Sequence, residues 1–297
     1  MSMAIHTERL TKRYGSTEAL RGLGLDVPEG SIYAFVGPNG AGKTTAIQTI
    51  LNLRQPTTGR AQVLGTDSRA LTHENFQHIG YVSENQRLPE WMTVKEFFEY
   101  LRPLYKTWDA ELHAELHRQF DLPPGRKLKQ LSRGMKMKAA LASALVFRPQ
   151  LLILDEPFTG LDPLVRDELI QGLLDRAEGM TIFVSSHDLA EIESFASHVG
   201  YLENGRLCLS EEMNVLTERF REVQVIFDGE VTRPATWPKD WLSPEQSGSI
   251  LRFVDTRYNP ALCQASFPAA RGIEAQPMNL RTIFVALARS GREGVRS

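Results

Sequence analysis

The feature that most constrains this chain is a glycine-rich segment at residues 37–45. It has the pattern G-x-x-x-x-G-K-[ST], in which backbone N–H groups point into a concavity that holds phosphate oxygens. We expect a buried strand at 31–36 and a helix at 44–53 whose positive N-terminal end faces the anion. Lys43 is expected to reach the β- and γ-phosphates, and Thr44 to ligate Mg²⁺. The segment therefore predicts a nucleoside triphosphate site at Gly37, Pro38, Asn39, Gly40, Ala41, Gly42, Lys43, Thr44 and Thr45.

A second segment supplies carboxylates. The apolar run 151–154 ends in Asp155 and Glu156, and such a run is typical of a parallel strand buried on both faces. Ligands bind at the carboxyl ends of strands in open α/β sheets, so Asp155 is expected to hold Mg²⁺ or its water shell. Glu156 is expected to polarise the attacking water. The alternative for Glu156 is an ordinary solvated residue after a strand.

With these and further motifs, the chain resembles the nucleotide-binding subunits of ABC transporters over residues 4–220. The matching pieces occur in the order that the family has them. They are an aromatic residue that stacks on adenine (Tyr14), the phosphate loop, the signature LSRGM at 131–135, the paired carboxylates, the loop GLDP at 160–163 and the sequence SSHD at 185–188.

The resemblance implies roles for residues outside the phosphate loop. In the family, the helix N-terminus at Ser132 and Gly134 faces the γ-phosphate bound by a second subunit, with Asp162 in the loop after the carboxylates. His187 is expected to hydrogen-bond the γ-phosphate and orient water beside Glu156. Without the resemblance, Ser132 is a plain helix cap and His187 a structural histidine.

The chain departs from the family pattern at the lid loop and at the signature. Glu84 stands where Gln is commonest, and it keeps acceptor oxygens for Mg²⁺ or the attacking water. The signature has Arg133 and Met135 in place of Gly and Gln, and the added positive charge beside a phosphate site is not expected to weaken nucleotide binding. With both variants, the chain resembles the branch of the family that exports drugs, peptides or lipids.

Composition agrees with a cytoplasmic subunit. The net charge of −2 and the lack of a basic tract interleaved with aromatic residues argue against a nucleic acid partner. The sequence has no apolar run near the ~20 residues that span a bilayer, and its start lacks the layout of a signal peptide. The cysteines, Cys208 and Cys263, fit no metal or disulfide framework, which favours a reducing compartment. We expect the protein to be peripheral on the cytoplasmic face of the membrane.

The motifs also organise the chain into domains. Residues 1–220 are expected to form an α/β domain, a P-loop NTPase core of the ABC type, with a helical subdomain at about 87–150. A capping box at Thr93 and Glu96 opens a helix in that subdomain. The lid loop from Glu84 to Trp91 is the expected contact with a membrane-spanning partner.

Residues 221–297 carry no family motif, and we expect a small α+β accessory domain of unassigned role. Runs at 223–227 and 250–254 are typical of strands, and 280–288 of a helix. A loop rich in Pro and Trp is expected between the two strands.

These features predict an ATPase that uses ATP and Mg²⁺, pairs with a second ATPase subunit (a homodimer or a close homologue) and drives a separate membrane-spanning transporter subunit, in the export direction. The alternative is a soluble ABC-type ATPase that remodels or assembles a protein complex. Such proteins often carry two ATPase cores, whereas this chain has one phosphate loop. A P-loop nucleotide kinase does not match the order of the motifs.

Overall fold

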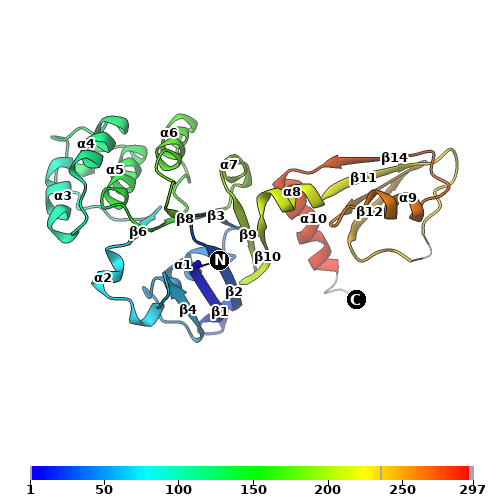
Figure 1. The fold of residues 1–297 in the computed structure, drawn as a ribbon, viewed down its shortest axis with the longest axis horizontal. Helices are drawn as coiled ribbons and strands as arrows, with labels where there is room; N and C mark the ends of the chain where they lie inside the picture. Colours follow the sequence, from blue (N-terminus) through cyan, green and yellow to red (C-terminus); the bar gives the residue numbers. More distant parts are fainter. Residues whose placement is uncertain (1, 235, 294–297) are drawn as a thin grey trace. The chain divides into compact units, whose positions relative to one another are not determined.

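The computed structural model describes residues 2–234 and 236–293, which divide into two compact units (Figure 1). The first unit comprises residues 2–188 and 194–210. The second comprises 189–193 together with the chain from 211 onward, so it begins before the boundary expected at 221 and includes a short piece from within the first unit's sequence. In the part of the chain that the structure describes, no helix combines the length and apolar character needed to cross a membrane.

A central, largely parallel sheet organises the first unit. Its order is β10-β9-β3-β8-β7-β6, and β7 is paired with β6 and β8 while β3 is paired with β8 and β9, all in parallel. The strands read as apolar runs because both faces of the sheet are covered. The carboxyl ends of β3, β6, β7, β8 and β9 meet at one edge of the sheet. The strands are β3 (Ile32–Val36), β6 (Ile79–Ser83), β7 (Leu151–Asp155), β8 (Thr181–Ser186), β9 (His198–Glu203) and β10 (Arg206–Glu212).

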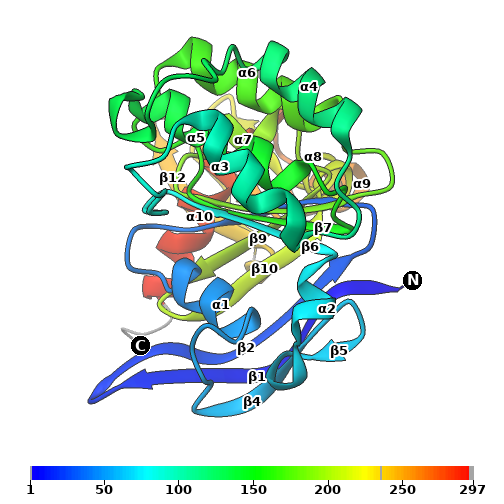
Figure 2. The same ribbon diagram turned by 90° about the vertical axis from the view of Figure 1, so that its left-hand side faces the viewer.

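An antiparallel N-terminal sheet lies on the other side of helix α1 (Lys43–Ile50) from the central sheet (Figure 2). Ile47 and Ile50 of α1 belong to one core with Phe35 and Ile153 from the central sheet and Leu25 from the N-terminal sheet. Its position between two sheets explains why Ala46, Ile47, Thr49 and Ile50 of this short helix are buried. The N-terminal sheet has the order β2-β1-β4-β5, made of β1 (Met3–Tyr14), β2 (Thr17–Pro28), β4 (Thr58–Val63) and β5 (Thr66–Asp67).

Helices cover the opposite face of the central sheet, and Figures 1 and 2 show α3, α4 and α5 gathered there. The predicted capping box is confirmed: the Thr93 hydroxyl accepts from the Glu96 N–H at 3.2 Å, and the Thr93 N–H donates to Glu96 Oε2 at 2.8 Å. Phe97 and Phe98 of that helix are buried. The helices of this unit are α1, α2 (His73–Phe76), α3 (Val94–Leu101), α4 (Ala110–Gln119), α5 (Arg133–Leu145) and α6 (Pro163–Leu174), with 3₁₀ turns at Ser68–Ala70, Arg102–Leu104 and Leu128–Gln130.

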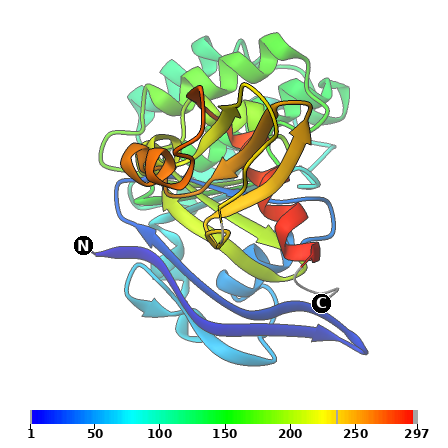
Figure 3. The same ribbon diagram turned by 90° about the vertical axis from the view of Figure 1, so that its right-hand side faces the viewer.

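The second unit is built on an antiparallel sheet of order β12-β13-β11-β14 (Figure 3). Its core contains Phe253 and Trp241 from the sheet and Phe267 from the end of α9. The helix α10 contacts the edge strand β12. The elements are α8 (Met213–Arg219), β11 (Arg221–Ile226), β12 (Trp241–Ser247), β13 (Ile250–Asp255), α9 (Pro260–Ser266), β14 (Gly272–Pro277) and α10 (Leu280–Glu293).

The expectation of a Pro- and Trp-rich loop between β11 and β13 is wrong at its C-terminal end, where the chain forms β12. Pro244 is tolerated because β12 is an edge strand and its register shifts between Leu242 and Glu245. Trp241 is buried, and its Nε1 donates to the Asp255 carboxylate at 2.9 Å. Its aromatic surface therefore fills the core instead of marking a loop.

The five-residue helix α7 (Leu189–Glu193) belongs to the second unit although it follows directly after His187 and Asp188 of the first. It contacts α10, and Glu193 Oε1 accepts a hydrogen bond from the Leu280 N–H at 3.1 Å at the start of that helix. Ile192 is fully buried. The carboxylate therefore caps α10 and stabilises its positive end.

The stability of the helical subdomain is expected to depend on the protonation of His113 and His117. Their rings are 4.7 Å apart and contact Phe98, and the Nε2 atom of each is buried without a hydrogen-bond partner. Burial lowers the pKa of both imidazoles below the ordinary 6.5, and the charges of His117 and Arg102 lower the pKa of His113 further. The folded state thus binds fewer protons than the unfolded state. The stability that the two neutral imidazoles contribute is fully present above the unfolded pKa, and it is lost as the pH falls from there through the lower pKa of the folded state.

Urea unfolding between about pH 8 and about pH 5 measures this effect, and we expect the midpoint to fall over that interval. His117→Gln should flatten the pH dependence, because one of the titrating groups is gone. The exposed His73 serves as the matched control, and His73→Gln should keep the wild-type slope. Equal slopes in all three proteins would contradict the assignment to the buried pair.

Candidate active site

The phosphate loop leads from β3 into α1, and its conformation requires glycine. Gly42 has φ of 109°, and a Cβ atom there would lie 2.5 Å from the Ala19 carbonyl oxygen. Gly37 has the same constraint from another side, since its Cβ would lie 2.2 Å from the Leu202 carbonyl oxygen. Both neighbours are backbone and cannot move aside. The loop therefore packs so closely against the backbone at Ala19 and Leu202 that neither glycine position has room for a side chain.

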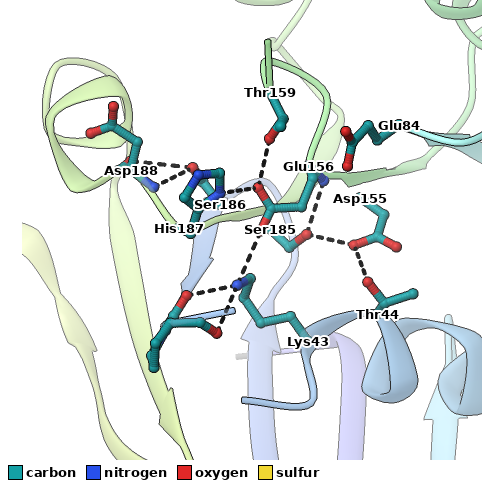
Figure 4. A network of polar contacts seen from close by, with 12 residues as sticks. Lys43, Thr44, Glu84, Asp155, Glu156, Thr159, Ser185, Ser186, His187 and Asp188 are labelled. Carbon is teal, nitrogen blue, oxygen red and sulfur yellow. Dashed lines mark hydrogen bonds and ion pairs between the residues drawn. The ribbon is translucent and has the colours of Figure 1, made fainter. Parts of the chain in front are cut away.

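A cavity of about 510 Å³ opens at this N-terminus (Figure 4). Four other segments complete its wall: β2 at Ala19, the lid loop at Glu84, the chain after β7, and the chain after β8 at His187. The sequence predicts most of these residues, but Ala19 and Thr159 are additions. The lining consists of Ala19, Asn39, Gly40, Gly42, Lys43, Thr44, Thr45, Glu84, Glu156, Thr159 and His187.

Lys43 is held by the loop that it follows. Its Nζ donates to the carbonyl oxygens of Gly37 at 2.6 Å and Pro38 at 3.3 Å, and lies 3.0 Å from Glu156 Oε1. Only 5% of the side chain is exposed. A buried ammonium group needs such partners, because its desolvation is otherwise costly. The charge is thus fixed at the floor of the cavity.

Thr44 and Asp155 bring the loop and β7 together. The Thr44 hydroxyl donates to Asp155 Oδ1 at 3.1 Å, and the Ser185 hydroxyl donates to the same oxygen at 2.7 Å. Burial raises the pKa of Asp155, and the hydrogen bonds from Ser185 and Thr44 oppose this rise. Ser185 is a residue whose role the sequence does not reveal, since its register opposite Asp155 is seen only in the paired strands.

Glu156 is positioned by its backbone and by three side chains (Figure 4). Its φ of 53° is rare for a residue with a side chain, and its N–H donates to the Ser185 hydroxyl at 3.0 Å. Its carboxylate accepts from Thr159 Oγ1 at 3.0 Å, and His187 Nδ1 lies 2.7 Å from it. Burial alone would raise the pKa of Glu156, but the hydrogen bond from His187 and the charge of Lys43 lower it below its usual range. The carboxylate is ionised at neutral pH.

Glu84 reaches the cavity from the lid loop. Its N–H donates to the Asp155 carbonyl oxygen at 2.9 Å, so the lid begins directly on the end of β7. Its side chain lines the cavity, and Oε1 lies 2.6 Å from Nη2 of Arg133.

The other predicted site residues lie outside this cavity. Tyr14 is 41% exposed, with Lys12 Nζ 5.2 Å from its ring centre. Ser132 and Asp162 act as helix caps, accepting from the N–H groups of Met135 at 3.2 Å and Val165 at 3.1 Å. Gly134 packs against Val165, whose Cγ1 would lie 2.8 Å from an added Cβ.

Comparison with known proteins shows the family to which the chain is related. The family model for ABC transporters matches residues 20–159. The chain is 36% identical over 222 residues to the bacitracin transport ATP-binding protein BcrA of Enterococcus faecalis, covering 72% of this chain and 70% of that protein. It is 31% identical over 229 residues to the lantibiotic transport ATP-binding protein SrtF of Streptococcus pyogenes, covering 74% and 97%.

Solved structures give the same result. An ATP-binding subunit of an ABC transporter superposes with a TM-score of 0.67 at 28% identity, covering 73% of this chain and 92% of that one. A dimeric post-hydrolysis ATP-binding cassette bound to ADP and Pi superposes with a TM-score of 0.64 at 25% identity, covering 70% and 98%.

The fold and site define a P-loop ATPase, and the chain belongs to the ATP-binding subunits of ABC transporters. It binds and hydrolyses ATP, and the hydrolysis drives a separate membrane-spanning transporter subunit.

Removing the Ser185 hydroxyl is expected to destabilise the first unit. Ser185→Ala leaves the Glu156 N–H without its shorter hydrogen bond and removes a donor from buried Asp155, at a cost of about 1–3 kcal/mol in the free energy of unfolding. Urea denaturation measures the loss, and Ser16→Ala at an exposed position is the control. A change no larger than that of the control would show that the bonds around Ser185 contribute nothing.

Proposed function

We propose that this protein binds Mg-ATP through the phosphate loop and hydrolyses it with Glu156 as general base. The observation that carries the proposal is the convergence of Lys43, His187 and Thr159 on the Glu156 carboxylate inside the cavity. The assignment is tested by comparing ATP binding and ATP hydrolysis in Glu156→Gln and Lys43→Ala variants.

The residues present suit Mg²⁺. The Thr44 hydroxyl and the Asp155 carboxylate are adjacent oxygen donors, and Mg²⁺ prefers such hard ligands together with phosphate oxygens and water. When bound, the ion would neutralise charge on the phosphates. Glu84 lines the same cavity and is the third acidic group available to the ion or its waters.

Lys43 and Glu156 are proposed to act in sequence. Phosphate oxygens attract Lys43 Nζ away from Glu156, because they carry more charge than a carboxylate. Losing the ammonium group removes one cause of the lowered pKa of Glu156, so its basicity rises when ATP is in place. His187, bonded to the same carboxylate, is the group that then keeps it oriented toward the attacking water.

A second ATPase subunit is proposed to complete each site. Ser132 and Gly134 lie at the N-terminus of α5, which suits an anion, yet neither lines the cavity of its own chain. A head-to-tail pair would bring this helix end against the γ-phosphate held by the other copy, with Asp162 at the interface. The dimeric arrangement of a related cassette supports this proposal.

The membrane-spanning subunit is proposed to bind beside the lid loop. Trp91 is 72% exposed and Tyr100 58% exposed, and both line a cavity of about 860 Å³ between the lid loop and α3. Exposed aromatic residues beside a hollow are typical of a docking site. The protein would then be peripheral on the cytoplasmic face of the membrane, and its relatives' names support export of peptide antibiotics as the transported class.

Glu156→Gln is expected to retain ATP binding and to lose most hydrolysis, because an amide cannot accept the proton. The expected loss is about 10²–10⁴-fold in kcat. Lys43→Ala should instead weaken nucleotide affinity, since the charge at the cavity floor is removed. Titration with a fluorescent ATP analogue and steady-state ATPase assays distinguish the two effects. Wild-type turnover in Glu156→Gln would remove Glu156 as the base.

The partner is tested by pull-down of tagged Glu156→Gln protein from detergent-solubilised native membranes with Mg-ATP. We expect a polytopic membrane protein in stoichiometric amount, and its recovery should fall about tenfold or more when Trp91→Ala is added, as for an interface hot spot. Leu53→Ala, which removes another exposed apolar side chain, is the control. Recovery of soluble partners alone would favour the remodelling ATPase.

A further inference from the structure

The lid loop and the signature helix of this chain are joined by ion pairs. Nη2 of Arg133 lies 2.6 Å from Glu84 Oε1, and Nζ of Lys136 lies 3.2 Å from Glu90 Oε1. Arg133 and Lys136 are three residues apart on α5 and therefore share one face of the helix. Glu84 and Glu90 lie at the two ends of the lid. The first turn of α5 thus holds the lid at both ends.

The two ion pairs occupy different surroundings. Glu84 lines the nucleotide cavity, whereas Arg133 does not and instead lies with Glu84 along a neighbouring cavity of about 370 Å³. The Arg133 guanidinium also covers Gly160, where an added Cβ would lie 2.9 Å from Nη1. Arg133 therefore contacts the lid and the loop that follows Glu156 without lining the nucleotide cavity, whereas its partner Glu84 lines it.

The charges near the nucleotide show why such a contact matters. The cavity already holds the carboxylate of Glu156, with Asp155 beneath it, against the single positive charge of Lys43. Glu84 adds a further negative charge at a place where ATP brings several more. It is 28% exposed, against 53% for Arg133, so water compensates Glu84 less well than it compensates Arg133.

We propose that Arg133 is a positioning residue for Glu84. Its guanidinium neutralises the Glu84 carboxylate and holds it at the edge of the Mg-ATP site. The two departures from the family pattern, Glu84 in place of Gln and Arg133 in place of Gly, then compensate each other. Together they replace two uncharged residues by an ion pair, so the net charge is unchanged. The inference rests on the proposed Mg-ATP site. The Arg133–Glu84 ion pair also links the lid to α5, and its strength depends on the charge of Glu84.

A double-mutant cycle on the full-length chain tests the pairing. Arg133→Gln leaves Glu84 uncompensated and should weaken binding of a fluorescent ATP analogue, measured in EDTA, about two- to fivefold. Glu84→Gln removes the carboxylate that Arg133 neutralises, so adding Arg133→Gln to this variant should cause no further loss of affinity. The double variant should return toward the wild-type affinity, because the charge balance is restored. Arg133→Lys should also remain close to wild type, since it keeps the charge.

The Lys136–Glu90 pair provides the matched control, because it joins the same two segments away from the nucleotide cavity. Its cycle, Lys136→Gln and Glu90→Gln, should show no coupling in nucleotide affinity. Thermal unfolding of every variant identifies any effect that comes from misfolding.

The outcomes are distinguishable. Coupling in the first cycle and its absence in the second would establish the role of Arg133. A double variant as weak as Arg133→Gln would overturn the proposal, because Arg133 would then act on the nucleotide without Glu84. An Arg133→Gln protein with wild-type affinity would also overturn it. Failure of the wild-type chain to bind the analogue at all would instead refute the proposed nucleotide site itself.

Discussion

The arrangement of the first unit depends on hydrogen bonds at the carboxyl edge of the central sheet. Asp155 accepts from Thr44 at the start of α1 and from Ser185 at the end of β8, and so joins three segments that are far apart in sequence. A buried carboxylate is stable only with such donors. These bonds, with the hydrogen bond from the Glu84 N–H to the Asp155 carbonyl oxygen, bring the phosphate loop, Glu156 and the lid to one cavity. Structure and chemistry therefore rely on one set of contacts.

The sequence predicts the regular parts of the fold well, for physical reasons. Buried parallel strands such as β7 are unbroken apolar runs, and α3 begins with a complete capping box. The misses lie where the local signal is mixed. Pro244 and the tryptophans around it are typical of a loop, yet the edge position of β12 tolerates the proline while the core takes Trp241. Such an outcome depends on tertiary packing.

The motifs in the sequence identify the residues of the site, but they do not show which of these residues contact one another. The sequence shows both departures, Glu84 and Arg133, but their ion pair joins residues separated by 49 positions. The positive φ of Glu156 is likewise invisible in a motif, since glutamate has no preference for that conformation. Ser185 gains its role only from strand register. Long-range geometry thus decides how the predicted residues work together.

The position of α7 has an evolutionary consequence. Residues 189–193, which follow His187 and Asp188, belong to the second unit, where Glu193 caps α10 and Ile192 is buried. A recombination event that exchanged only the segment after β10 would separate α7 from the helix with which it packs. The C-terminal unit can therefore be inherited intact only together with a short insert in the middle of the catalytic sequence, and the two parts of the gene are expected to diverge in concert.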